Sequence, residues 1–355
     1  MKIGDIDKNL AVSTDIPFND IVWIDAKDAP VKIHGLAVHE HGKPFLRMPA
    51  DAAKAVSDAV ASLNTNTAGG RIRFATNSPY IAIRAVMPDN GTMPHITMLG
   101  QSGFDLYAVN DGKESYAGSF MPGNRNHGYS SWKPTDSVMR TYVINMPLYD
   151  PVDEVYIGLS ASAEICEPDD YVYEKPVLYY GSSITQGGCA SRPGNSYQAM
   201  ISRMLSCDHI NLGFSGSAHG EDAIAEYLAS LDVSVFVCDY DHNAPSPDHL
   251  EKTHYPLYRT FREKHPTVPI ISVTKPDFNP QNNDDVRRRE IVIQTFNLAL
   301  NSGDENVYFV DGSHLFDGEM RDSCTVDGCH PNDLGFFRMA RGIGQVVGDV
   351  LKKQA

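Results

Sequence analysis

The stretch Val177-Leu-Tyr-Tyr-Gly-Ser-Ser-Ile-Thr-Gln-Gly187 decides the fold of this chain, because a short apolar run leads directly into small residues and a pair of serines. The apolar run predicts a buried strand, and the small residues predict a tight turn after it. Such a turn can hold a serine hydroxyl out from the carboxyl edge of a parallel sheet, where open α/β folds bind their ligands. Ser183 is therefore the candidate nucleophile.

Strand-like and helix-like patterns alternate from Pro176 to the end of the chain. This alternation predicts a parallel sheet covered by helices on both faces, which is a three-layer α/β/α domain with five strands. The strands are expected at residues 177–180, 209–213, 233–239, 270–274 and 307–310. The helices are expected near residues 196–205, 221–231, 247–265, 285–301 and 332–352.

A different pattern fills the first 170 residues. Apolar and polar residues alternate in short runs that Gly, Pro, Asn and Asp interrupt, and this period of two predicts a β-sandwich of the jelly-roll kind. The Ala-rich residues 49–63 have apolar side chains at helical spacing and predict a single helix within the sandwich. We therefore expect an accessory domain over residues 1–170 and a catalytic domain over residues 176–355, joined by the acidic segment 166–175.

Charge and cysteine content exclude several classes of function. The chain has 355 residues, with 30 Lys and Arg against 45 Asp and Glu, and a formal net charge of −15. This balance argues against binding to nucleic acid or anionic lipid. The first residues lack the apolar core of a signal peptide and no run is long enough to span a membrane, so we expect a cytoplasmic protein with reduced cysteines. The oligomeric state stays open, and a homo-oligomer is compatible with the sequence.

Other predicted strand ends offer partners for Ser183. Asp327 and His330 lie three residues apart before the final helix, a spacing that lets a carboxylate fix the tautomer of an imidazole facing a serine. Gly216 follows the second strand and can present its backbone N–H, and Asn243 follows the third and can offer a side-chain amide. Taken one at a time, an Asp-Gly turn explains Asp327, an ordinary turn after a strand explains Gly216 and a helix cap explains Asn243, all without chemistry. Four such signals in order at strand ends favour an active site.

These residues resemble the four sequence blocks of the SGNH, or GDSL-like, hydrolases, which are named after Ser, Gly, Asn and His. The resemblance covers about residues 176–353. Upstream, Gly103-Phe-Asp-Leu-Tyr107 resembles the G-x-D-L-Y signature of an N-terminal β domain that precedes one branch of this family.

The resemblance implies a role for each block. Ser183 would be the nucleophile, His330 the base and Asp327 the acid that orients the base. The oxyanion hole would consist of the backbone amides of Ser183 and Gly216 and the side chain of Asn243.

Two departures from the family pattern stand beside these residues. Ser182 replaces the aspartate of the usual Gly-Asp-Ser, so two adjacent hydroxyls compete for the role of nucleophile, and the alignment favours the second. The third block usually reads Gly-x-Asn-Asp, whereas Asp241 and Ala244 flank His242 and its neighbouring asparagine here. This change brings an extra carboxylate and an imidazole to the oxyanion side. His242 and Arg192, which lies in the glycine-rich loop after the nucleophile, are candidates for contact with a polar substrate.

The sequence predicts neither a metal nor a cofactor. His34, His39 and His41 lie close together, but no fourth ligand is evident nearby, and solvent-facing strand histidines are the simpler interpretation. The phosphate-loop pattern with its lysine is absent, which argues against a nucleotide-dependent enzyme.

The constellation predicts a serine esterase that removes a short acyl group, with acetyl as the first choice, from a carbohydrate or a similar polar alcohol. The expected partner is a small acylated polar substrate such as an acetylated sugar, and the sugar rests on fold analogy with β-sandwich modules that border glycans. An acyltransferase that passes the same acyl-enzyme to a hydroxyl acceptor is the alternative. A catalytically inactive binding protein is a third hypothesis.

Overall fold

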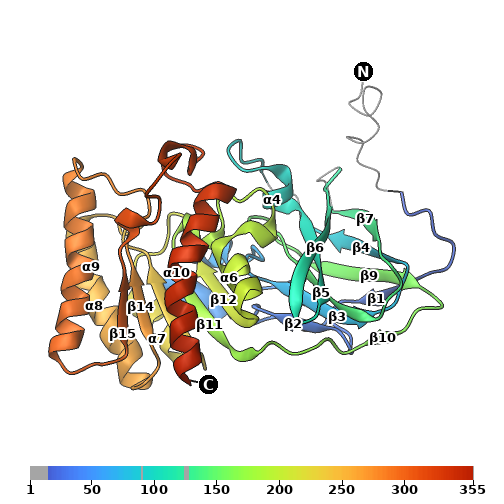
Figure 1. Cartoon of the computed structure of the whole chain (residues 1–355), viewed down its shortest axis with the longest axis horizontal. Coiled ribbons are helices and arrows are strands. Elements are labelled where there is room, and N and C mark those ends of the chain that lie inside the picture. The colour runs from blue at the N-terminus through green and yellow to red at the C-terminus, as the bar shows by residue number, and fades with distance from the viewer. Residues whose placement is uncertain (1–14, 89–90, 124–127, 355) are drawn as a thin grey trace.

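The computed structural model describes residues 15–88, 91–123 and 128–354, which form two antiparallel sheets and one parallel sheet (Figure 1). The antiparallel sheets belong to the first half of the chain and the parallel sheet to the second. This arrangement confirms the predicted combination of a β-sandwich with an α/β domain. None of the helices in these ranges is long and apolar enough to cross a membrane.

The parallel sheet has five strands, and the first of them along the chain lies inside the sheet. In spatial order the strands are β12 (Cys207–Gly213), β11 (Tyr173–Gly181), β13 (Val235–Asp239), β14 (Ile270–Val273) and β15 (Val307–Val310). The chain therefore adds one strand on one side of β11 and three on the other. This reversal creates a topological switch point beside β11, and open α/β sheets bind their ligands at the carboxyl ends of the strands at such a point.

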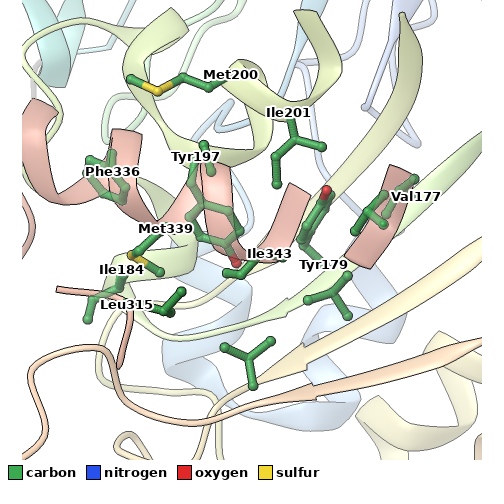
Figure 2. Packing of buried hydrophobic residues seen from close by; sticks show 14 of the residues in the cluster. Val177, Tyr179, Ile184, Tyr197, Met200, Ile201, Leu315, Phe336, Met339 and Ile343 are labelled. Atoms are coloured by element: carbon green, nitrogen blue, oxygen red, sulfur yellow. The ribbon is translucent and has the colours of Figure 1, made fainter. Parts of the chain in front are cut away.

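The side chains of β11 alternate between the two faces of the sheet, which explains why helices cover both. The helices are α6 (Tyr197–Leu205), α7 (Asp222–Ser230), α8 (Pro247–Lys264), α9 (Asn283–Asn301) and α10 (Asp333–Gln354). Val177 and Tyr179 pack against α6 and α10, as Figure 2 shows. Leu178 and Tyr180 face the opposite way and pack in a second core with α7, α8 and α9. All four side chains are buried, as is typical of a central parallel strand.

The two antiparallel sheets of the first half share one core. One sheet has the order β1 (Ile21–Asp25), β9 (Glu154–Ser160), β4 (Tyr80–Val86) and β7 (Tyr129–Pro134). The other has the order β10 (Ile165–Cys166), β3 (Arg71–Thr76), β8 (Arg140–Asn145), β5 (Phe104–Asn110) and β6 (Lys113–Phe120), with β2 (Lys32–His34) also paired with β3. Alternate residues from both sheets fill the core between them, among them Ile81, Ile83 and Ile157 from the first and Phe74, Phe104 and Ile144 from the second.

The prediction of a single helix over residues 49–63 is wrong. The chain forms two short helices, α2 (Ala50–Val56) and α3 (Asp58–Leu63), separated by Ser57 in an extended conformation. The Ser57 hydroxyl accepts a hydrogen bond from Val60 N at 3.1 Å and so caps α3. Serine favours such a cap over a position inside a continuous helix, because its hydroxyl can bond to the nearby backbone. Val60 is buried in the core that contains α7, so these helices pack on the α/β domain and not within the sandwich.

Arg71 of β3 joins the sandwich to the edge strand of the parallel sheet. Its buried guanidinium pairs with Asp208 of β12 and donates to the backbone carbonyl of His209 at 2.9 Å. Asp208 also contacts His34 Nδ1 at 2.9 Å. Burial opposes ionisation of Asp208, but the charge of Arg71 lowers the pKa of its carboxyl to about 2. A buried charge is tolerated when it is paired in this way, so the two halves meet through specific contacts.

Candidate active site

Three loops meet at the carboxyl edge of the parallel sheet. Gly181, the last residue of β11, pairs with Gly213 at the end of β12 and with Asp239 at the end of β13. The three strands therefore end at the same level, and the segments that follow them flank the switch point. These segments carry three of the four predicted sequence blocks.

Glycine and serine build the turn that holds the candidate nucleophile. The helix α5 (Ser183–Gln186) begins directly after β11, and Ser182 caps it by accepting a hydrogen bond from Ile184 N at 3.1 Å. A Cβ on Gly181 would lie 2.1 Å from Thr185 Oγ1 and 2.2 Å from a backbone oxygen of β13. Such contacts are too short for any side chain, so only glycine allows this sharp passage from strand to helix.

Ser183, His330 and Asp327 form a continuous hydrogen-bonded chain. Ser183 Oγ lies 2.9 Å from His330 Nε2, and His330 Nδ1 lies 2.8 Å from Asp327 Oδ2. In the neutral imidazole, Nδ1–H donates to Asp327 and Nε2 accepts from the Ser183 hydroxyl. Solvent exposure increases along these three residues, from 7% for Ser183 to 22% for the side chain of His330 and 37% for that of Asp327. This is the arrangement by which a general base activates a sheltered nucleophile.

The loop before α10 holds Asp327 against His330 through its own backbone. Asp327 Oδ1 accepts hydrogen bonds from Cys329 N at 3.1 Å and from His330 N at 2.8 Å. A bridge between Thr325 and Pro331 closes the loop. Burial opposes ionisation of Asp327, but the hydrogen bonds from the His330 backbone and ring lower the pKa of its carboxyl to about 2. The carboxylate is therefore charged at neutral pH and can stabilise an imidazolium.

Asn243 and Gly216 are in direct contact. In the orientation that satisfies its neighbours, the Asn243 carboxamide oxygen accepts hydrogen bonds from Gly216 N at 3.0 Å and from Ser217 N at 2.8 Å. The NH₂ group of Asn243 then faces acceptor atoms. Gly216 has a φ of +66°, and a Cβ there would meet nothing within 4 Å. Glycine is therefore favoured at this position by the left-handed backbone conformation and not by a lack of space. The structure brings both oxyanion candidates together, with the Gly216 N–H already donating to Asn243.

His242 contacts protein groups through both of its ring nitrogens. Nε2 lies 2.7 Å from Ser182 Oγ, and Nδ1 lies 2.9 Å from Asp241 Oδ1. Neither nitrogen is therefore free for the substrate contact that we expected of this residue.

Arg192 is bound by the G-x-D-L-Y motif of the sandwich. Its Nη1 donates to Asp105 Oδ2 at 2.8 Å and to the hydroxyl of Tyr107. Asp105 also accepts from Gly194 N at 2.9 Å and from Asn145 Nδ2 at 2.8 Å. Burial raises the pKa of the Asp105 carboxyl, although the charge of Arg192 opposes that rise. The motif thus fixes the loop that follows Ser183, and Arg192 joins the two halves of the protein through these contacts.

Two residues of the first half reach the site although no sequence pattern pointed to them. The Tyr149 hydroxyl donates to the backbone carbonyl of Ser183 at 3.0 Å, and burial raises its pKa, which keeps it protonated as a donor. The ring centroid of His95 lies 5.5 Å from that of His330. The helix α4 (Met98–Ser102) follows His95, and its N-cap Thr97 donates to the carbonyl of Ser191 at 2.6 Å. Only the tertiary fold brings these positions together.

The candidate metal ligands near the N-terminus do not converge. His34, His39 and His41 contact different partners, namely Asp208, the carbonyl of Leu36, and the carboxylates of Asp25 and Asp28. Within the described ranges, two other groups have potential ligand atoms within 4.8 Å of one another: His95, Cys189 and His330, and Asp239, Asp241 and His242.

Two family models match the chain. The model of the GDSL-like lipase/acylhydrolase family matches residues 174–348. The model named GxDLY, described as the N-terminus of esterases of the SGNH-hydrolase type, matches residues 21–165 and includes the motif around Asp105. A search of curated proteins found no match.

Solved structures share both halves of the architecture. A protein from Bacteroides ovatus described as a GDSL-like lipase is 32% identical, with a TM-score of 0.84 over 94% of this chain and 98% of its own. The salicylyl-acyltransferase SsfX3 from a tetracycline biosynthetic pathway is 19% identical, with a TM-score of 0.77 over 93% and 98%. A family two carbohydrate esterase from Clostridium thermocellum, in complex with cellohexaose, is 15% identical, with a TM-score of 0.58 over 81% and 94%.

Proposed function

Because the chain belongs to the GDSL-like lipase/acylhydrolase family, we propose that it is a serine esterase that releases a short acyl group, acetyl in the first instance, from a carbohydrate or a similar polar alcohol. The observation that carries this proposal is the hydrogen-bonded chain of Ser183, His330 and Asp327 at the switch point of the parallel sheet. A serine next to a neutral imidazole, itself oriented by a carboxylate, is equipped for acyl transfer.

The reaction follows from the positions of these atoms. Ser183 Oγ attacks the ester carbonyl, and its proton passes to His330 Nε2. The backbone N–H of Ser183 and the side-chain NH₂ of Asn243 donate hydrogen bonds to the oxyanion. The Gly216 N–H, which already donates to the Asn243 oxygen, is shared between that oxygen and the oxyanion. His330 then gives the proton to the departing alcohol, and the acyl group stays on Ser183. A water molecule that His330 deprotonates releases the acid and restores the hydroxyl.

A pocket lined by Tyr149 supports a polar alcohol as the leaving group. Its volume is about 380 Å³, and its wall includes Tyr149, whose hydroxyl donates to the backbone of Ser183. All of its lining residues are uncharged, and hydroxyl or amide groups come from Ser62, Thr65, Asn66, Thr92 and Gln101. Such groups can donate to and accept from the hydroxyls of a sugar, and Leu63, Met93 and Pro151 add apolar surface to the same wall. The neighbouring carbohydrate esterase, solved with cellohexaose, supports the same choice.

An acyltransferase is the second candidate. Ser183 is only 7% exposed, and a sheltered acyl-enzyme gives a bound hydroxyl acceptor an advantage over water. The structural similarity to a salicylyl-acyltransferase also favours this candidate. The chemistry up to the acyl-enzyme would be the same in both cases.

The test is release of p-nitrophenol from p-nitrophenyl acetate, butyrate and octanoate by the protein and by its Ser183→Ala variant. We expect turnover of the acetate that decreases with acyl length and is lost in the variant. Equal turnover by both proteins would refute Ser183 as the nucleophile. Repeating the reaction with a free sugar and analysing the products separates the two candidates, because only a transferase yields the acylated sugar as the main product.

A further inference from the structure

Ser182, His242 and Asp241 form a second Ser–His–Asp chain beside the first, with distances of 2.7 Å and 2.9 Å between successive side chains. The two adjacent serines of the nucleophile turn thus face two different histidines. The second chain is enclosed, because Ser182 is fully buried and the side chains of His242 and Asp241 are 10% and 2% exposed. A hydroxyl with no exposed surface cannot reach an external ester, so Ser182 is not a second nucleophile.

The hydrogen bonds around Ser182 are complete when His242 is neutral. Nδ1–H of His242 then donates to Asp241, and the Ser182 hydroxyl donates to Nε2. The Ser182 oxygen accepts from Ile184 N at 3.1 Å, so both its donor and its acceptor capacity are used. Each bond therefore supports a fixed position of the turn that carries the nucleophile.

Asp241 extends this chain to the next strand and helix. Its Oδ2 accepts from Lys275 N, just beyond β14, at 3.0 Å, and its Oδ1 accepts from His242 N at 2.8 Å. Arg288 of α9 donates to the backbone carbonyls of Asp241 and Ala244, the latter at 2.8 Å. These contacts hold the loop that contains the oxyanion asparagine against the ends of β11, β13 and β14.

The titratable groups that face His242 are Asp239 at the end of β13, Asp241 after it, and Lys275 after β14. Burial opposes protonation of His242, but the hydrogen bond to Asp241 raises its pKa above the ordinary value. The carboxylates and the imidazole lie close enough to hold a cation. Since both ring nitrogens of His242 are already hydrogen-bonded within the protein, the hydrogen bonds to Ser182 and Asp241 account for the arrangement without a bound cation.

We propose that Ser182, His242 and Asp241 are positioning residues that lock the nucleophile turn to the oxyanion loop. They keep Ser183 and Asn243 at the separation that the transition state requires. Ser182 and Asp241 are positions where this chain departs from the usual family pattern, and here they form a matched set with His242. The inference rests on the proposed function in that Ser183 is the nucleophile, and it does not depend on which ester is the substrate.

The test compares Ser182→Ala, His242→Gln and the double variant. Misplacement of a catalytic group by about 1 Å costs on the order of 100-fold in rate. We therefore expect kcat for p-nitrophenyl acetate to fall about 10- to 100-fold, while KM stays within about twofold. The double variant should be no slower than the slower single variant, because both changes break the same chain.

The matched control is Thr295→Val. This change deletes a buried hydroxyl that lies 2.9 Å from the Nδ1 of the buried His254, between α8 and α9. It should lower the melting temperature by an amount similar to Ser182→Ala while kcat stays unchanged. An equal loss of kcat in this control would overturn the proposal, because it would show that kcat reports only stability.

A second measurement does not require the substrate. A fluorophosphonate labels Ser183 when its Oγ bonds to phosphorus, fluoride leaves and the proton goes to His330. We expect Ser182→Ala and His242→Gln to slow this labelling by the same factor as kcat. If the unaltered protein is labelled at Ser183 but hydrolyses no acetate ester, the proposed substrate fails and labelling still tests the positioning role. Unchanged labelling in both variants, or losses that multiply in the double variant, would overturn the proposal.

Discussion

Asp239 links the electrostatics of the site to the stability of the protein. Its carboxyl is fully buried at the end of β13, with Oδ2 at 3.3 Å from Thr185 Oγ1 and 3.4 Å from the Tyr197 hydroxyl. Its Oδ1 has no hydrogen-bond partner in the part of the chain that the structure describes. Burial raises the pKa of this carboxyl from 3.8 to about 7, although the nearby His242 opposes the rise. The folded protein therefore keeps a proton on Asp239 that the unfolded chain loses.

The sign and size of the effect follow from this difference. Between about pH 4 and pH 7 the folded state holds more protons at Asp239 than the unfolded state, so its contribution to the free energy of unfolding decreases as pH rises. A shift of about three pKa units corresponds to a loss of roughly 4 kcal/mol at about 1.4 kcal/mol per unit. Asp239→Asn removes the ionisable group and hence the loss. Relative to the unaltered protein, the variant should gain up to roughly 4 kcal/mol as pH is raised from about 4 to about 8.

Urea unfolding of both proteins at several pH values across this range measures the difference directly. Other groups titrate in the same window, and His254 is one of them, because burial lowers its pKa to about 4. A lowered histidine pKa makes stability rise with pH, which is the opposite sign, but this contribution is present in both proteins and cancels in the comparison. An identical pH dependence of the two free energies of unfolding would refute the argument that Asp239 is protonated because it is buried.

Four further outcomes are expected. Ser183→Ala should lower kcat by roughly three to six orders of magnitude with the fold intact, and Ser182→Ala by much less; a swapped result in the ester assay would place the nucleophile one residue earlier. His330→Ala should match Ser183→Ala, and the double variant should be no worse, whereas near-additive losses would argue against a shared mechanism. Asp327→Asn should lower kcat by about 10² to 10⁴, because the imidazole loses its orienting carboxylate; an unchanged pH–rate profile and kcat would contradict this role. Arg192→Met should destabilise the protein by roughly 3 to 5 kcal/mol in urea unfolding, because it leaves the buried Asp105 carboxylate without its counter-charge; KM should stay nearly unchanged. A raised KM at unchanged stability would instead indicate a substrate contact.

The parts of the fold that the sequence predicted are those with local signals. All five parallel strands and the five long helices of the second half follow from apolar periodicity, because each element must bury one face or two. The helix expected over residues 49–63 failed for a local reason as well. Periodicity continues through Ser57, but the hydroxyl of that serine caps a new helix instead of continuing the first.

The candidate site also has contacts that the sequence predicted and contacts that it did not. Its four blocks could be predicted because the carboxyl ends of parallel strands converge, so residues far apart in sequence meet when each follows a strand. The bond between Tyr149 and Ser183 could not, because it joins a loop of the first half to the nucleophile turn and leaves no periodic trace. The hydrogen bond between Ser182 and His242 could not be predicted either. The sequence shows that the residues in these two blocks differ from the family pattern, but it does not show that their side chains meet.

Residues of the first half contact both the candidate site and the core of the second half. Tyr149 donates to the backbone carbonyl of Ser183, and Asp105 fixes the loop that follows it through Arg192. Val60 is buried in a core of the α/β half, and Arg71 is buried against its edge strand. A sandwich attached only by a linker would make none of these contacts. The position of the turn that carries Ser183 therefore depends on both halves.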